Sequence, residues 1–159
     1  MIKTIDTKDI AECVNVIKES FLTVANDFGF TEENASRFTA FAITEERLMW
    51  QLKNEHRPMY AYYDGKIVGY YSLVAMDEHK CELNNLCVLP SYRHNRIGEE
   101  LLKHAFHTAK SLNYTKMHIG IVEENKVVKR WYESMGFVHI GIEKFDFLPF
   151  TCGYMERDI

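Results

Sequence analysis

The segment from Leu86 to Leu102 combines an apolar run, a turn with two arginines and the start of an amphipathic helix. Arg93 and Arg96 occupy the turn, and Gly98 follows them. Backbone N–H groups at such a junction meet the positive end of the helix dipole, which favours a phosphate. The same pattern also fits an ordinary strand–helix turn with solvated arginines. The anion-binding loop predicted here consists of Arg93, His94, Asn95, Arg96, Ile97, Gly98 and Glu99.

A second segment, Asn125 to Phe137, contains a candidate acid. It predicts a helix that includes Tyr132 and ends at Gly136, in the position where helices favour glycine. A phenol has an ordinary pKa of about 10 and can donate a proton to a departing group. By spacing alone, a core aromatic beside Trp131 is the better explanation of Tyr132. A catalytic role for Tyr132 therefore depends on the context of the whole segment.

The elements that must position these groups follow the order of a mixed α/β fold with helices packed on a sheet. Strands are expected at 2–5, 59–63, 67–76, 82–89, 116–122, 137–147 and 150–156. The first helix has an apolar face made of Ile10, Cys13, Val14, Ile17 and Phe21. Further helices are expected within 31–55 and at 97–112 and 125–135. The strands that flank helix 97–112 should be parallel, with a right-handed crossover.

Composition limits the function classes. The chain has 159 residues, of which 47% are hydrophobic and 26% charged, so one compact domain over residues 1–159 is expected. A net charge of −4 argues against nucleic-acid binding. No signal peptide is visible, and no run of about 18 apolar residues predicts a membrane span. No metal site is predicted, and free thiols in a reducing cytoplasm are expected for Cys13, Cys81, Cys87 and Cys152.

The two segments together resemble the GNAT N-acetyltransferase superfamily. The sequence Arg93-x-x-Arg96-x-Gly98 is similar to its acetyl-CoA signature, Gln/Arg-x-x-Gly-x-Gly/Ala. The segment from Asn125 to Phe137, Asn-x-x-Val-x-x-Trp-Tyr-x-x-x-Gly-Phe, is similar to its Asn-x-x-Ala-x-x-Leu-Tyr-x-x-x-Gly-Phe. The resemblance covers nearly the whole chain and is weakest over residues 1–57. It implies a mixed, mostly antiparallel central sheet flanked by helices, with splayed parallel strands at its centre.

One position departs from the superfamily pattern. Arg96 stands where the signature has its first glycine, a residue that lets the backbone come close to a ligand. Two readings remain: the Arg96 side chain points outward and is tolerated, or it adds a cation near the phosphates. Backbone geometry favours the first.

The resemblance implies that acetyl-CoA is the donor and that backbone groups hold it. The N–H of Leu86 would face the thioester carbonyl, and the main chain of Leu86 and Val88 would pair with the pantetheine arm. This requires the parallel strands to splay apart, often at a bulge. Asn125 would hydrogen-bond the cofactor, and Tyr132 would lie near the sulfur as a general acid. The implied cofactor-binding set is Leu86, Cys87, Val88, Arg93, His94, Asn95, Arg96, Ile97, Gly98, Glu99, Asn125 and Tyr132.

The resemblance also suggests a base. Glu82 matches the place of a glutamate that acts as base in histone-type members, here through a water, although a solvated strand residue explains it equally well. His118 and Glu123 are weaker candidates. The expected mechanism is direct attack by the amine on the bound thioester. Cys87 is the competing nucleophile, but strand alternation turns it opposite to its neighbours, toward the packed face.

The acceptor is expected to be an amine bound by the N-terminal helices and the last strands. Those segments are aromatic and contain Asp27, Glu32, Glu33, Glu45 and Glu46, which would suit a cationic amine unless they are ordinary surface charges. A polyamine, an amino sugar, an amino acid or a peptide N-terminus all fit. The alternatives are a protein lysine or N-terminal acetyltransferase, and an inactive CoA-binding sensor or interaction module. The apolar C-terminal run permits a homodimer.

Overall fold

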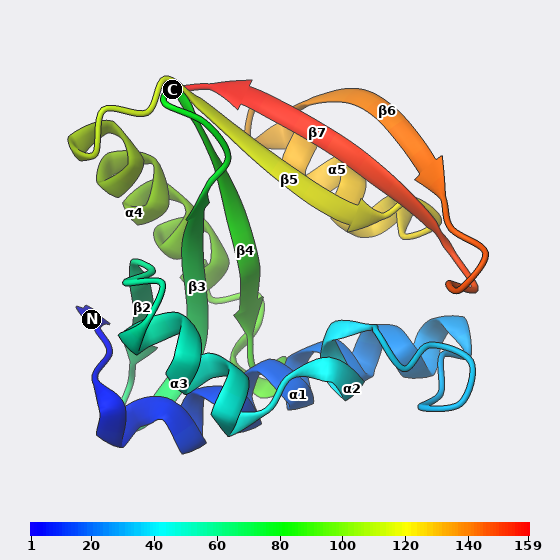
Figure 1. Ribbon diagram of the computed structural model, residues 1–159, viewed down its shortest axis with the longest axis horizontal. Coiled ribbons are helices and arrows are strands. Elements are labelled where there is room, and N and C mark those ends of the chain that lie inside the picture. Colours follow the sequence, from blue (N-terminus) through cyan, green and yellow to red (C-terminus); the bar gives the residue numbers. More distant parts are fainter.

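The computed structural model describes residues 1–159 and contains a seven-stranded sheet flanked by helices (Figure 1). The strand order is β1-β2-β3-β4-β5-β7-β6, and only the central β4–β5 pair is parallel. This confirms the predicted fold class. The strands are β1 (Ile2–Thr4), β2 (Met59–Tyr63), β3 (Ile67–Ala75), β4 (Lys80–Val88), β5 (Lys116–Val122), β6 (Val138–Lys144) and β7 (Thr151–Asp158). The helices are α1 (Ile10–Phe28), α2 (Thr39–Ala42), α3 (Glu45–Lys53), α4 (Ile97–Ser111) and α5 (Lys126–Ser134), with short 3₁₀ turns at Thr7–Asp9 and Pro90–Tyr92.

The helices form where apolar spacing and end signals agree. The apolar face expected for α4 is buried at all six positions, Ile97, Leu101, Leu102, Ala105, Phe106 and Ala109. Helix α1 ends at Gly29, whose φ of 72° is the left-handed conformation that glycine adopts without steric cost. The side chain of Thr44 accepts a hydrogen bond from the Arg47 N–H and so caps α3.

The region 31–55 is less helical than its sequence suggests. Thr31 is a residue type that caps helices, and its hydroxyl accepts a hydrogen bond from the Asn34 N–H at 3.2 Å. A turn follows it, however, and no helix begins before Thr39. The cap at Thr31 therefore does not start a helix. Instead, Ala35 and Phe38 are buried against other parts of the chain.

The central strands separate after a short contact. The β4–β5 ladder runs only from Lys80↔Lys116 to Glu82↔His118, and beyond it the strands diverge into a V (Figure 1). In β4, Asn85 and Leu86 oppose the single residue Tyr71 of β3, which is a β-bulge, and Asn85 has a φ of 53°. The expected splay and bulge are therefore present.

A charged network joins three strands at the closed end of the V. The Glu156 carboxylate on β7 accepts hydrogen bonds from Lys80 Nζ on β4 at 2.8 Å and from His118 Nδ1 on β5 at 2.9 Å. Burial alone would raise the pKa of Glu156, but these two hydrogen bonds and charges lower it overall. The network holds the last paired rungs together at the point where the strands separate.

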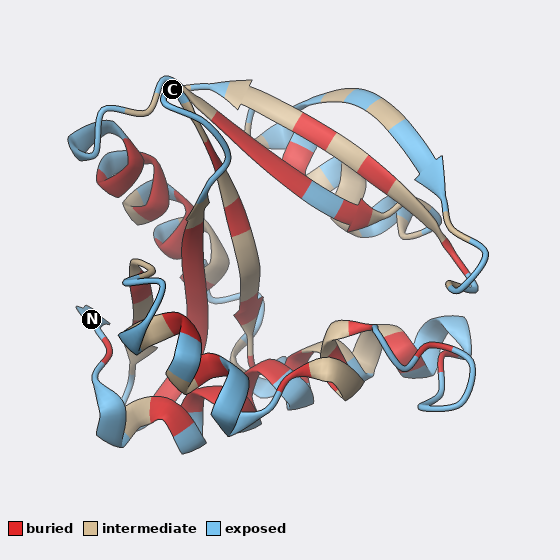
Figure 2. Cartoon of the chain, viewed as in Figure 1, coloured by how far each residue is buried: buried red, intermediate tan, exposed pale blue.

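Two apolar clusters stabilise the two ends. The larger contains 31 buried residues, among them Ile67, Val68, Tyr70, Tyr71 and Leu73 of β3, a strand that is buried except at its last two residues (Figure 2). The smaller consists of Ala25, Phe30, Ala35, Phe38, Ala40 and Phe150. In it, the Phe150 ring lies 4.8 Å from Phe30 and 5.8 Å from Phe38, centroid to centroid. It thus joins the N-terminal helical region to the start of β7 across the open end of the V.

The sheet ends at β6, whose outward side chains are apolar. Val138, Ile140 and Ile142 are all exposed, at alternate positions on this edge strand. Homodimerisation through the last strands stays a prediction. None of the helices combines the length and apolar character needed to cross a bilayer.

We expect Leu101→Ala to destabilise the fold by roughly 2–5 kcal/mol, because it opens a cavity at a fully buried position under β3 and β4. Urea unfolding followed by circular dichroism would measure the change. Val127→Ala, at a position 77% exposed on α5, is the matched control and should shift stability little. Equal effects of the two substitutions would contradict this account of the core.

Candidate active site

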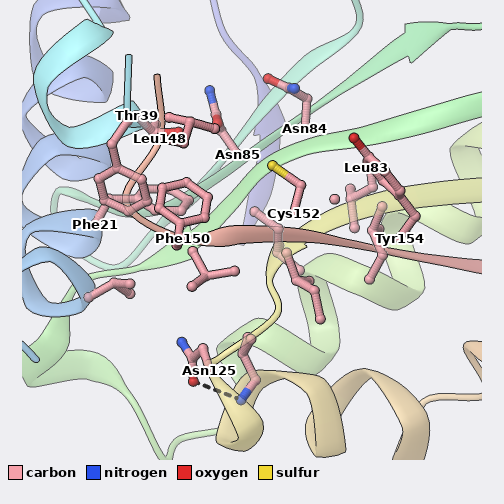
Figure 3. Close-up of a pocket in the computed structure, with 18 of the residues that line it drawn as sticks. Phe21, Thr39, Leu83, Asn84, Asn85, Asn125, Leu148, Phe150, Cys152 and Tyr154 are labelled. Carbon is pink, nitrogen blue, oxygen red and sulfur yellow. Dashed lines mark hydrogen bonds between the residues drawn. The ribbon is translucent and has the colours of Figure 1, made fainter. Parts of the chain in front are cut away.

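A cavity of about 410 Å³ lies in the V between β4 and β5. Four of the predicted site residues line it together: Glu82, Leu86, Asn125 and Tyr132. Figure 3 shows the cavity wall with Asn84 and Asn85 of β4, Asn125 before α5, and Phe21 and Phe150. These residues are far apart in sequence and line one cavity because β4 and β5 diverge.

The predicted anion-binding loop lies outside this cavity, between the end of β4 and α4. His94 and Arg96 have φ values of 66° and 62°. The N–H groups from His94 to Glu99 donate no hydrogen bond within the chain, and the first bond of the helix runs from the Glu100 N–H to the Arg96 carbonyl. Six consecutive free donors at a helix N-terminus make a site suited to an anion.

The Arg93 guanidinium is occupied within the protein. It donates to the Val88 carbonyl at 3.1 Å, the Thr23 hydroxyl at 3.1 Å and the Ser20 carbonyl at 3.0 Å. These bonds tie the end of β4 to α1. The side chain therefore holds the loop in place, and its part in binding the cofactor stays a prediction.

Arg96 shows why the signature favours glycine at its position. A φ of 62° is a conformation that L-residues adopt with steric strain and glycine adopts freely. No carboxylate forms an ion pair with Arg96, although its charge lowers the pKa of Glu99 after the larger effect of the Lys103 hydrogen bond. The backbone requirement of the signature is thus met without its glycine.

The edge of β4 faces the gap. The Leu89 N–H donates to the Val68 carbonyl in β3, and alternation along the strand turns the main chain of Val88 the other way. Leu86 lies in the bulge, where the ladder is interrupted, and lines the cavity. The Val88 carbonyl at this edge already accepts from Arg93 Nε, and the Val88 N–H faces the gap, where an extended ligand could pair with it.

Tyr132 lines the cavity, whereas Cys87 lies near it in the core and does not line the cavity. Tyr132 is 8% exposed, and its hydroxyl has no hydrogen bond within the chain. Burial raises its pKa, with a smaller contribution from Cys87, so the phenol keeps its proton at neutral pH. Burial also raises the pKa of the Cys87 thiol to about 12, and Cys87 belongs to the core as alternation predicts.

Glu82 and Asn125 have defined partners. Asn84 Nδ2 donates to Glu82 Oε1 at 2.9 Å, which orients the carboxylate at the last paired rung of β4. Asn125 Oδ1 accepts from the Val128 N–H at 3.3 Å and so caps α5 (Figure 3). Capping was not anticipated for Asn125, and it leaves the Asn125 amide nitrogen free for a ligand.

The sequence of the chain is similar to known proteins. The sequence profile of the acetyltransferase (GNAT) family matches residues 20–137, a range that contains both motif segments. The chain belongs to this family. An uncharacterised N-acetyltransferase of Mycobacterium tuberculosis (strain ATCC 25618 / H37Rv) is 27% identical over 114 residues, covering 71% of this chain and 73% of that protein.

Solved acetyltransferases share the fold over the whole chain. The PaiA N-acetyltransferase of Thermoplasma acidophilum, solved in complex with coenzyme A, superposes with a TM-score of 0.81 at 21% identity, covering 100% of this chain and 98% of that one. The ribosomal-protein-S18-alanine N-acetyltransferase of Escherichia coli gives a TM-score of 0.76 at 18% identity, covering 100% and 93%. The predicted GNAT membership is confirmed, and the chain is an acetyltransferase by family.

The weaker base candidates of this acetyltransferase are occupied. His118 belongs to the Glu156 network and does not line the cavity. The Glu123 carboxylate is paired with Lys129 Nζ at 2.7 Å and His139 Nε2 at 2.9 Å. Among the carboxylates considered from sequence, only Glu82 lines the cavity.

Of the aromatic and acidic entrance considered for the acceptor, the acidic half consists of ordinary surface charges, which is the alternative left open from the sequence. The aromatic half is supported, because Phe21, Phe38, Phe147 and Phe150 line the cavity. The five acidic side chains do not line it: Asp27, Glu32, Glu33, Glu45 and Glu46 are all exposed on the surface. Proximity in sequence to the aromatic residues does not bring these acidic side chains to the cavity, since Glu32 and Glu33 lie in a turn, and Glu45 and Glu46 lie on the exposed start of α3.

Sequence reasoning also missed polar residues at the site. Asn84 and Asn85 line the cavity beside Glu82, and Arg37 lies at its edge. Asn85 carries a local signal, because asparagine tolerates the positive φ that a bulge requires. No pattern in the sequence singles out Arg37, which reaches the site only through the path of the chain before α2.

We expect Arg96→Gly to bind acetyl-CoA with a dissociation constant within about threefold of the native value and to be up to about 1 kcal/mol more stable, because relief of the strained φ exceeds the entropy cost of glycine. Calorimetric titration and thermal unfolding would measure both quantities. Arg96→Ala removes the same charge but keeps the strain. A loss of affinity of tenfold or more in both variants would show that the guanidinium contacts the phosphates.

Proposed function

We propose that this GNAT-family protein transfers the acetyl group of acetyl-CoA to a primary amine by direct attack in a ternary complex. The observation that carries the proposal is that Glu82, the bulge at Leu86, and Tyr132 line one cavity. A proton acceptor, a backbone donor and a proton donor are the three groups that acetyl transfer to an amine requires.

The chain offers acetyl-CoA a fitting set of groups. The free N–H groups from His94 to Glu99 suit its pyrophosphate, and the edge of β4 at Leu86 and Val88 suits the amides of its pantetheine arm. The Asn125 amide nitrogen is a further donor on the opposite wall. When bound, acetyl-CoA supplies the acetyl group as a thioester, which an amine can attack.

Glu82 is the proposed base. Amines are protonated at neutral pH, and an ammonium cannot attack a carbonyl, so its proton must leave first. The Glu82 carboxylate, held by Asn84, would accept this proton directly or through one water. The free amine nitrogen then bonds to the acetyl carbon as the carbon–sulfur bond breaks, and the second proton that the nitrogen loses balances the one that the thiolate takes up.

Tyr132 is the proposed acid. The departing thiolate needs a proton, and burial keeps the Tyr132 phenol protonated. Its hydroxyl has no competing partner in the chain, so it is free to donate. The Leu86 N–H in the bulge would stabilise the carbonyl oxygen as it gains charge. Cys87 supports the direct route, because a thiol with its pKa raised to about 12 holds almost no thiolate at neutral pH.

Titration of acetyl-CoA into the folded protein, followed by calorimetry, tests the donor. We expect saturable binding, together with much weaker binding of S-acetyl-pantetheine, which lacks the pyrophosphate. Absence of heat at millimolar acetyl-CoA would contradict the proposal. Equal affinity for the two thioesters would contradict only the role of the loop between β4 and α4.

Tyr132→Phe should lower kcat by about 100-fold, the usual size of general-acid catalysis, while acetyl-CoA affinity changes less than about threefold. The reason is that the hydroxyl is needed only when the thiolate departs. Thiol release in the presence of an accepted amine measures kcat. An unchanged kcat would remove the acid assignment and leave Tyr132 as a core aromatic.

Glu82→Gln should lower kcat/KM by about 100-fold at neutral pH, because an amide cannot take up the ammonium proton. The deficit should shrink as pH rises toward the pKa of the amine, where more of the acceptor is already neutral. Glu78→Gln, in the exposed turn before β4, is the matched control and should behave as the native protein. A pH-independent deficit would indicate a structural effect instead.

A further inference from the structure

A second cavity of about 250 Å³ lies beside the first and is basic. Only three of its eleven lining residues are hydrophobic. Three arginines line it, Arg37 before α2, Arg47 on α3 and Arg57 before β2, although the chain as a whole has a net charge of −4. Positive charge is thus concentrated in one hollow of an acidic protein.

Two of the three guanidinium groups have no carboxylate partner. Arg57 is paired with Glu55 Oε2 at 2.6 Å and also reaches Asn84 Oδ1 at 3.5 Å. Arg37 and Arg47 lie in no ion pair, and Arg37 is held only by the face of Phe147, 4.3 Å from the ring centroid. Their charge is therefore available to a ligand.

A polar group in the wall also lacks a partner. Gln51 on α3 is 7% exposed and lines this cavity, and its amide oxygen has no hydrogen bond within the chain. A buried amide without a partner costs free energy unless a ligand or water satisfies it. The free guanidinium groups are donors suited to an oxyanion, whereas the unsatisfied Gln51 oxygen is an acceptor and needs a donor, such as a water or an N–H of the ligand.

The two cavities are adjacent and share part of their walls. Arg37, Thr39, Glu82, Asn84 and Asn85 line both of them. A molecule bound near the arginines therefore lies next to the Glu82 carboxylate, and Glu82 separates the basic cavity from the cavity that holds Tyr132. An acceptor could place one end in each.

We infer that the acceptor is a small amine that carries its own oxyanion, a carboxylate or a phosphonate, as amino acids and aminophosphonates do. The oxyanion lies with Arg37 and Arg47, which can grip it through paired N–H donors. The ammonium lies at Glu82, where it loses its proton before attack. This inference rests on the proposed function and names the substrate class of the same site.

The charge pattern separates this acceptor class from the other amines considered. A polyamine would place cations beside two unpaired guanidinium groups, which is repulsive. An amino sugar without an acidic group would leave both arginines unpaired. A peptide or protein N-terminus would bring its carboxylate only at a distant end. Of these classes, only a small amine with its own oxyanion places an anion at the arginines and an ammonium at Glu82 at the same time.

Matched pairs of acceptors test the inference. Thiol release would be measured for leucine against leucinamide, 2-aminoethylphosphonate against propylamine, and an amidated alanine-initiated peptide. We expect kcat/KM for each acid to exceed that of its uncharged partner by about tenfold or more, as charge-assisted hydrogen bonds predict. Amides, propylamine or the peptide reacting as well as the acids would overturn the inference while leaving acetyl transfer intact.

Variants of the exposed Arg47 identify the group responsible. Arg47→Gln should reduce the acid-to-amide ratio of kcat/KM by about tenfold, and Arg47→Glu should bring it below one. Arg130→Gln, an exposed position on α5, removes the same charge elsewhere and should keep the ratio. An unchanged ratio in both Arg47 variants would assign the preference to other residues and overturn the site.

A binding measurement separates the two failures. Thermal unfolding in saturating CoA should show a rise in Tm with 2-aminoethylphosphonate that propylamine does not give and Arg47→Glu abolishes. If that rise appears but no amine releases thiol, the proposed function fails and the anion site stands. If neither the rise nor acid-dependent turnover appears, the inference is overturned.

Discussion

The divergence of β4 from β5 is the constraint on which the site depends. A continuous parallel ladder would satisfy the backbone groups of both strands and leave no space between them. Here the ladder ends after three rungs, and the bulge at Asn85 turns β4 away. Backbone polar groups without partners are costly when buried, so this gap is stable only where water or a ligand can satisfy them. The candidate site is therefore the gap between β4 and β5, where the sheet lacks its inter-strand hydrogen bonds.

Contacts at both ends of the gap between β4 and β5 keep the two strands apart. At the closed end, Glu156 joins Lys80 and His118 across three strands. At the open end, Phe30, Phe38 and Phe150 join the N-terminal helical region to β7. Arg93 adds a third link, between α1 and the end of β4. Residues that look like functional candidates in the sequence, His118 and Arg93 among them, thus act as supports for the residues that line the cavity.

The cavity beside Glu82 is basic although the chain has a net negative charge. The acidic side chains near the N-terminal helices lie on the surface, and the free arginines line the hollow beside Glu82. Net charge describes the whole surface, whereas substrate choice depends on the few charges that face the site. The acceptor class that we infer follows from these few charges and not from the composition of the chain.

The sequence by itself determined the elements, the order of the strands along the chain and the two motif segments. Periodicity identifies α4 and its buried face, and turn signals place Gly29 and Thr44 at helix ends, because these features depend on residues close in sequence. The motif residues Leu86, Tyr132 and Glu82 could be named for the same reason, and the resemblance supplied their common context.

Tertiary structure alone decided which of these residues meet and what the others do. The Arg93 guanidinium could not be assigned to α1 from spacing, since its partners Ser20 and Thr23 lie about 70 residues away in sequence. Spacing also could not place Arg37 and Arg47, which line one cavity with Glu82 only because of the path that the chain takes. Local sequence fixes local conformation, but charge pairing and cavity walls come from long-range contacts that no short pattern encodes.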